Sequence, residues 1–348
     1  MKCVGDRRHS RGRRSRGSDL EGNFHITMST IRPLIIAGAT AAGLFATIAP
    51  ASSALSTDAA PQPTGIGVQV PVYAGPASDA PSLVPADAAD AKAAPTVKFT
   101  VTYVGFTPAA KAAFQRALNA WASKLSSPVP ITVRASWEPL GANILGSAGP
   151  SYAWQCNGML CVDAIANKKA GRNLNPAPDI VARFSSNFSN WHFGTGPAPV
   201  GKYDFQSVVM HEIGHGVGFL GFGNVTNGKG TVQLQGFNSP YDRFTRLGST
   251  KTSPLLWKMP NNSAQLGRAL TSNNVFFDSA KVRSANRGKA AKLYAPAGFR
   301  RGSSYSHLDE KAFPKGNPNS LMTYAIGDGE TIRSQGPVSL ALLKSIGW

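Results

Sequence analysis

The amino-acid sequence predicts an α+β fold in which helices pack on a mixed, twisted β-sheet. Short segments with alternating apolar residues stand before and after a segment that repeats apolar residues at helical spacing. A second helical segment, with two histidines four residues apart, follows the last of these strands. Because both kinds of element have one apolar face, they are expected to bury those faces against each other.

The predicted elements begin with a strand within residues 96–106. Its apolar face consists of Phe99, Val101 and Tyr103. Thr107 and Pro108 then have the residue types that favour the N-cap and the first position of a helix. The core stripe of that helix is formed by Phe114, Leu118, Trp121 and Leu125. Residues 131–137 and 179–184 are predicted to be two further strands.

Residues 1–54 have the features of a leader that contains a secretory signal peptide. After Met28, the expected true start, Arg32 supplies a positive charge and residues 34–49 an apolar stretch. Small residues at 52–54 then form a cleavage site. The apolar stretch is short for a membrane span, so a secreted chain without a stable span is expected, and an uncleaved anchor is the alternative.

The rest of the chain is expected to hold one folded domain, over residues 96–348. Residues 55–95 are rich in Ala and Pro and show no helical or alternating pattern. They are therefore expected to be a flexible pro-segment or linker, with order beginning near Thr96. Only Cys156 and Cys161 lie beyond the leader, and an even pair in an exported chain predicts one disulfide.

The chain is strongly basic, with 36 Lys and Arg against 18 Asp and Glu and a formal net charge of +18. Residues 1–54 contain 8 of the basic and 3 of the acidic residues, which leaves 28 against 15. The densest basic group, within residues 281–301, consists of Lys281, Arg283, Arg287, Lys289, Lys292, Arg300 and Arg301. This charge predicts attraction to an anionic surface or an acidic substrate. No zinc-finger, RNA-recognition or basic-zipper pattern accompanies it, so no specific binding of nucleic acid is expected.

Residues 208–223, VVMHEIGHGVGFLGFG, contain His211, Glu212 and His215 in the order of a zinc-peptidase helix. The helix is expected over residues 205–217, with Asp204 as its N-cap. Histidines four residues apart lie on one face of a helix, so both imidazoles can reach one metal ion. Glu212 stands beside them, where it can reach a water molecule at the metal.

A third ligand is needed, because catalytic zinc usually takes three protein ligands. In the commonest extended motif the third histidine would stand at the position of Gly221. After His215 the only histidine is His307, and the two glutamates beyond it lie outside any clear helical pattern. Asp242 is the nearest carboxylate and the competing ligand. His307 is favoured because neutral imidazole is a good zinc ligand and is scarce in this chain.

The segments HEIGHGVGF, SHLDE and NSLMTY together resemble the metzincin zinc endopeptidases, particularly the leishmanolysin-like ones. In that group a long insertion precedes the third histidine, and a methionine-containing turn follows it. The resemblance implies that His211, His215 and His307 bind one catalytic zinc ion and that Glu212 is the general base. It also implies that Met322 belongs to the methionine turn.

The resemblance further implies a metzincin-like fold, with two long helices and an irregular C-terminal subdomain that ends in a helix. Gly218 would form the turn that ends the motif helix, and residues 219–306 would be a family-variable insertion. The apolar pieces SPYDRF, NVFFDS and AKLYAP of this insertion predict extra strands within it. Tyr324 stands where the astacin branch has a tyrosine that binds zinc or stabilises the transition state. An ordinary packed tyrosine is the alternative at this position.

The expected function is therefore a secreted zinc metalloendopeptidase that acts on a protein or peptide substrate. A zinc-activated water would attack the peptide bond, with Glu212 as the general base. One alternative is a secreted surface-binding module with a structural zinc ion, for which Asp242 would supply the fourth ligand. Another is a zinc amidase that acts on cell-wall peptide.

Overall fold

The structure of the chain is a computed structural model that describes residues 63–65, 67–87 and 94–348. The chain divides into two compact units, and all described residues belong to the second, Thr57–Trp348. The predicted leader and signal peptide lie outside the described residues. Among the residues that are described, no helix is both long and apolar enough to span a membrane.

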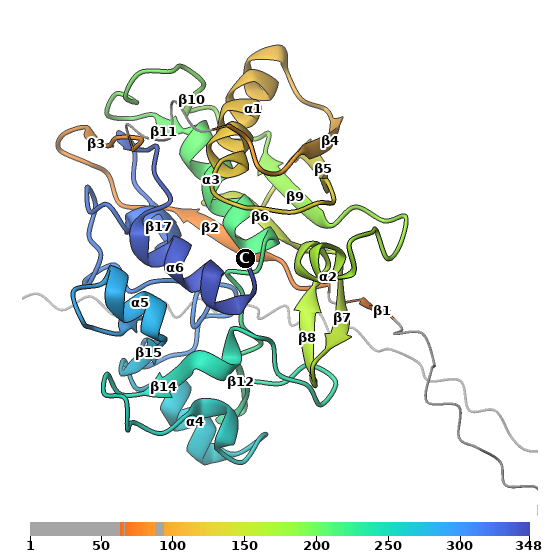
Figure 1. Cartoon of the computed structure of the whole chain (residues 1–348). Coiled ribbons are helices and arrows are strands. Elements are labelled where there is room, and N and C mark those ends of the chain that lie inside the picture. The colour runs from red at the N-terminus through yellow and green to blue at the C-terminus, as the bar shows by residue number, and fades with distance from the viewer. Residues whose placement is uncertain (1–62, 66, 88–93) are drawn as a thin grey trace, which may run out of the picture. The chain divides into compact units, whose positions relative to one another are not determined.

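A six-stranded mixed sheet, in the order β17–β2–β6–β9–β5–β4, lies within this unit (Figure 1). Its strands are β2 (Val70–Ala74), β4 (Phe99–Val104), β5 (Ile131–Glu138), β6 (Ile144–Pro150), β9 (Ile180–Ser185) and β17 (Ala325–Ile326). β4, β5 and β9 are parallel, whereas β6 runs antiparallel to both of its neighbours, β9 and β2. The other edge of β2 pairs in parallel with β17. The predicted α+β class and mixed sheet are therefore confirmed.

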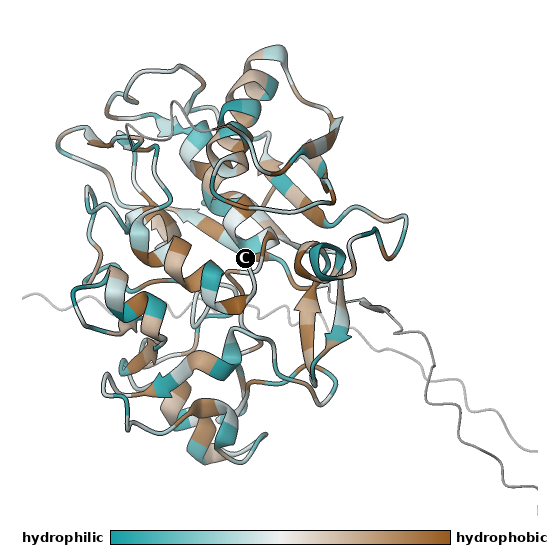
Figure 2. Ribbon diagram, in the orientation of Figure 1, coloured by the Kyte–Doolittle hydropathy of each residue, from teal (hydrophilic) through white to brown (hydrophobic). Residues whose placement is uncertain are grey.

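Two long helices, α1 (Pro108–Ala122) and α3 (Phe205–Gly216), pack against each other and lie along the sheet. Both start at the predicted caps: Thr107 Oγ1 accepts the N–H of Ala110 at 3.2 Å, and Asp204 accepts the N–H of Ser207 at 2.8 Å. The indole of Trp121 on α1 donates to the carbonyl of Met210 on α3 at 3.0 Å. Figure 2 shows apolar residues beside polar ones along these elements, as expected where one face is buried.

The expectation that order begins near Thr96 is wrong for residues 67–87. β2 belongs to the central sheet, and β3 (Ser82–Val84) pairs in parallel with β18 (Glu330–Ile332). β1 (Pro63–Gly65) also pairs, with β7 (Tyr152–Cys156). Val70 and Val72 are the buried residues of β2, but the proline between them and the brevity of the strand hide the alternation in the sequence.

The extra strands expected between residues 219 and 306 are present. The segment contains β12 (Asn224–Thr226), β13 (Lys229–Thr231), β14 (Thr245–Leu247), β15 (Val275–Phe277) and β16 (Ala291–Lys292). It also contains the helices α4 (Ala264–Leu270) and α5 (Ala280–Ala285). Residues 219–306 are therefore ordered by three strand pairings and two short helices.

Five further elements complete the secondary structure described here. They are β8 (Met159–Val162), α2 (Asp163–Ala170), β10 (Trp191–His192), β11 (Tyr203–Asp204) and the C-terminal helix α6 (Pro337–Ile346). Cys156 and Cys161 form the expected disulfide across the hairpin of β7 and β8, with their Cα atoms 5.9 Å apart. The chain therefore ends in a helix, as the sequence predicts.

Gly218, two residues beyond α3, is expected to tolerate no side chain. Its φ is +111°, and an added Cβ would lie 3.1 Å from the Ile346 side chain and 3.3 Å from that of Ile165. Gly218→Ala should therefore lower the free energy of unfolding by about 1–3 kcal/mol, measured by urea denaturation. Gly196→Ala is the matched control, because a Cβ there meets nothing within 4 Å. Equal losses in both variants would contradict this account.

Candidate metal centre

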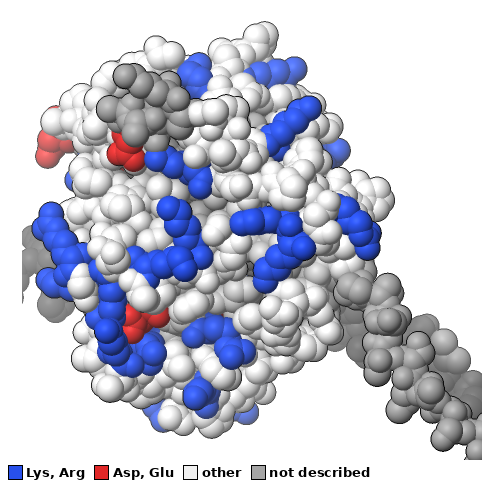
Figure 3. Space-filling view, viewed as in Figure 1, with Lys and Arg blue, Asp and Glu red and all other residues white. Residues whose placement is uncertain are grey.

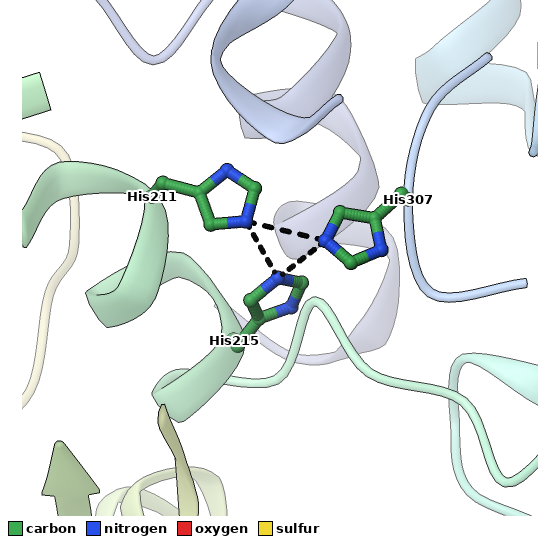
Figure 4. A group of neighbouring side chains, drawn as sticks. All are labelled: His211, His215 and His307. Atoms are coloured by element: carbon green, nitrogen blue, oxygen red, sulfur yellow. Dashed lines mark hydrogen bonds between the residues drawn. The ribbon is translucent and has the colours of Figure 1, made fainter. Parts of the chain in front are cut away.

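Three histidines from two distant parts of the chain meet in the core of the unit (Figure 4). His211 and His215 extend from α3, and His307 comes from the loop after β16, 92 residues beyond His215. The Nε2 atoms lie 2.9 Å apart for His211 and His215, 3.1 Å for His215 and His307, and 3.2 Å for His211 and His307. All three side chains are fully buried. The structure therefore brings together the three ligands that the sequence favours.

The outer nitrogen of each imidazole is bonded to a backbone carbonyl. His211 Nδ1 lies 2.6 Å from the oxygen of Leu321, His215 Nδ1 lies 2.8 Å from that of Phe219, and His307 Nδ1 lies 2.7 Å from that of Ser303. A carbonyl can only accept, so each Nδ1 carries the proton and donates it. In the neutral rings each Nε2 then presents a lone pair to the other two. Three lone pairs at this distance repel one another unless a cation lies among them.

This donor set fits a zinc ion. Zn–N bonds of about 2.0–2.1 Å in tetrahedral geometry put two ligand nitrogens roughly 3.3 Å apart. The observed separations of 2.9–3.2 Å are only slightly shorter. Burial lowers the pKa of His211 to about 4, and it lowers the pKa values of His215 and His307 well below the ordinary range. The imidazoles are thus in the neutral form that binds zinc, and three of them leave one tetrahedral position for another ligand.

Glu212 lies beside this group on α3 and is also fully buried. Its Oε1 accepts the backbone N–H of Val72 at 3.3 Å. Burial raises the pKa of Glu212 well above its ordinary value, and the backbone N–H groups of Val72 and Ala148 oppose part of that rise. Gly146 on β6 leaves room for the side chain, since a Cβ there would lie 3.2 Å from Glu212 Cγ. The carboxyl group is thus held between α3 and the sheet.

Met322 lies directly behind the motif helix. It is fully buried, and a Cβ added at Gly214, between the two helical histidines, would lie 2.7 Å from its Sδ atom. The same turn, Ser320–Met322, supplies the carbonyl that accepts from His211, and the carbonyl of Met322 accepts the N–H of Leu308 at 2.8 Å. The turn therefore contacts the helix and the segment of the third histidine together.

Tyr324 is partly buried and stacks on Tyr294, with ring centroids 4.2 Å apart and an interplanar angle of 21°. Its hydroxyl is hydrogen-bonded to Glu310, and burial together with the charge of Glu310 raises the pKa of Tyr324 to about 12. These contacts are those of a packed tyrosine. A role for its hydroxyl in catalysis stays a prediction.

Asp242, the competing ligand, uses both carboxylate oxygens elsewhere. Oδ1 accepts the N–H of Phe222 at 3.0 Å and the hydroxyl of Tyr305 at 2.9 Å. Oδ2 accepts both the N–H and the hydroxyl of Ser239 at 2.7 Å. Asp242 is fully buried but is not a member of the histidine group. It therefore anchors the loop after α3 to Tyr305, two residues before His307.

Sequence reasoning missed this anchor. Tyr305 is fully buried with a φ of +75°, and the hydroxyl of Tyr241 donates to its carbonyl at 2.8 Å. A tyrosine in a polar segment gives no signal of burial, because Tyr241 and Asp242 lie more than 60 residues away from it in sequence. Only the folded chain shows that these contacts hold the backbone that carries His307.

Asp242→Asn is expected to lower the free energy of unfolding by about 1–3 kcal/mol, because an amide cannot accept from all four donors. Zinc should still bind at one ion per chain, since the carboxylate is not a ligand. Chemical denaturation and metal analysis of the purified protein measure the two quantities. The exposed Asp79→Asn is the control. Loss of zinc with unchanged stability would make Asp242 a ligand after all.

The basic group at residues 281–301 is only partly free to attract an anion. Arg283 Nε lies 2.6 Å from a carboxylate oxygen of Asp278, and Lys292 Nζ lies 3.9 Å from one of Asp309. Figure 3 shows Lys and Arg side chains spread over the visible face, with few acidic ones. An anionic partner for this group stays a prediction.

Comparison with known proteins finds no matching family, no similar curated protein and no similar solved structure.

Proposed function

We propose that this chain is a secreted, metzincin-type zinc endopeptidase. One observation carries the proposal: three buried imidazoles direct their Nε2 lone pairs at one point, with Glu212 beside them on the same helix. The residue types and their order in the chain, HExxH with a distant third histidine, agree with the zinc peptidase motif.

The residues of the site suit peptide hydrolysis. A zinc ion held by His211, His215 and His307 would supply Lewis acidity to a water molecule and to the scissile carbonyl. Glu212 would take the proton of the water and return it to the leaving amine. The backbone carbonyls on Nδ1 orient the three rings and increase their basicity.

The contacts of Asp242 bear on the surface-binding alternative. A structural zinc ion needs four protein ligands, and the candidate for the fourth has both oxygens bonded to other groups. A three-histidine set that leaves one position open therefore favours catalysis. A zinc amidase acting on cell-wall peptide would use the same residues, so the substrate has to be determined by assay.

Digestion assays test the proposal. The protein should cleave casein, lose the activity in a strong chelator, and recover it when zinc is added back. Release of peptides from peptidoglycan without digestion of casein would identify the amidase. A tightly bound zinc ion without hydrolysis of either substrate, in protein from which β2 has been removed, would identify a structural site.

A further inference from the structure

β2 lies between β6 and β17 in the central sheet. Along one edge Val70 pairs with Ala148 and Val72 with Gly146 on β6, and along the other edge Tyr73 pairs with Ala325 on β17. We infer that residues 67–74 occupy the groove that binds an extended peptide substrate, and that they keep the enzyme inactive until they are displaced. This inference rests on the proposed peptidase function.

The contact with Glu212 places this strand at the reacting position. The backbone N–H of Val72 donates to Glu212 Oε1 at 3.3 Å, so a main-chain amide already faces the proposed general base. A substrate has to bring its scissile amide to the same carboxyl group. Val72, Glu212 and the three histidines are all fully buried. With β2 in place, the main chain of a substrate cannot enter.

The two neighbouring strands have the chemistry of a peptide groove. If β2 left, β6 would become an edge strand with a row of unpaired N–H and C=O groups, and an extended peptide pairs with such an edge by strand addition. The short strand β17 would offer the second side. The groove therefore recognises a substrate mainly by its extended main chain, and the side chains of the substrate occupy the spaces beside the strands.

Two cavities mark the continuation of this groove beyond the ends of β2. One of about 500 Å³ lies beside Gly67–Val70 and is also lined by Arg301 and Gly302. The other, of about 440 Å³, lies beside Tyr73–Pro76 and is also lined by Ser303 and Tyr324. A substrate longer than the five residues of β2 would extend into both.

The strand fits closely but is attached in a way that permits its release. A Cβ added at Gly149 would lie 1.9 Å from the carbonyl oxygen of Val68. A Cβ added at Gly302 would lie 2.7 Å from Cδ of Pro71. β2 precedes every other strand of its sheet in the chain, and the loop that follows contains the exposed residues Asp79 and Ala80. Cleavage in this loop would free β2 and leave β6, β9, β5 and β4 paired with one another. β17 would lose its pairing with β2, whereas β3 would stay paired to β18.

The first experiment inserts a recognition sequence for a site-specific protease between Asp79 and Ala80 of the full chain. After cleavage, the N-terminal fragment should separate on size-exclusion chromatography, and casein digestion should rise about tenfold or more, as expected if at most about one molecule in ten is open before the cut. A fragment that separates without any change in zinc-dependent digestion, or one that stays bound with activity already maximal, would overturn the inference.

A binding measurement separates this inference from the proposed function. Cleaved protein carrying Glu212→Gln is mixed with a labelled peptide of residues 67–75, GVQVPVYAG, and anisotropy is recorded. The peptide should bind, and the same peptide with Val72→Asp should not. If it binds while the wild-type protein digests nothing, the peptidase proposal fails and the groove remains. If the wild-type protein digests casein but does not bind the peptide, the groove assignment fails.

A strand substitution in the uncut chain covers the case in which cleavage unfolds the protein. Val72→Asp puts a charge where β2 is buried, so it should expel the strand, activate digestion without cleavage, and leave the main thermal transition in place. Leu83→Asp on β3 is the control, because β3 does not pair with β2 and that side chain is already 48% exposed. Unfolding of the whole unit by Val72→Asp would show that β2 is an integral strand and would overturn the inference.

Discussion

Replacing Glu212 by Gln is expected to slow peptide-bond hydrolysis by about 10²–10⁴-fold and to leave zinc binding intact. The amide keeps the shape of the side chain and can still accept the N–H of Val72, but it cannot take a proton from water. Burial raises the pKa of Glu212 well above its ordinary value, so an ionised carboxylate there costs stability that a neutral amide does not. The variant should therefore melt at the same temperature as the wild type or higher.

The wild type and Glu212→Gln are compared after β2 has been released from each, so that substrate can reach the site in both proteins. Initial rates on a fluorogenic peptide, zinc content and thermal melting are measured on the same preparations. Glu138→Gln is the control, because Glu138 lies at the end of β5 with 40% of its side chain exposed. A Glu212→Gln protein that digests at the wild-type rate would exclude general-base catalysis by this residue.

Replacing His307 by Ala is expected to weaken zinc binding by more than about 100-fold, because even residues that only support a ligand contribute 10–100-fold. The two helical histidines would remain, with Nε2 atoms 2.9 Å apart, but two imidazoles hold zinc poorly. Zinc stabilises a protein according to its affinity for the folded form, so the rise in melting temperature on adding zinc should shrink.

Without metal, the wild type and His307→Ala should differ less in stability than they do with zinc. In chelator the wild type keeps three lone pairs in contact, and His307→Ala removes one of them, which offsets part of the stability lost with the side chain. Competition against a fluorescent chelator measures the affinity. His192→Ala is the control, since that ring lies on β10 and bonds to the carbonyl of Gly196 at 3.1 Å. Unchanged zinc affinity in His307→Ala would remove it from the site.

Local patterns in the sequence were sufficient for several parts of this protein. The cap residues Thr107 and Asp204 start the two long helices where predicted, and the spacing of His211 and His215 puts both rings at one point. The disulfide between Cys156 and Cys161 spans five residues. Each of these features depends on residues only a few positions apart in the sequence, so propensity and spacing are enough to predict it.

The sequence favoured His307 over Asp242, but only the tertiary structure showed that His307 joins the histidine group while Asp242 does not. The tertiary structure alone gave the place of residues 67–74. The first depends on four hydrogen bonds that occupy the Asp242 carboxylate, two of them from residues that the fold brings close. The second depends on the edges of β6 and β17, which are distant in sequence from β2 and give a five-residue, proline-containing strand its stability. Such a segment has no amphipathic pattern of its own, because its structure comes from main-chain pairing with partners that exist only once the rest of the sheet has folded.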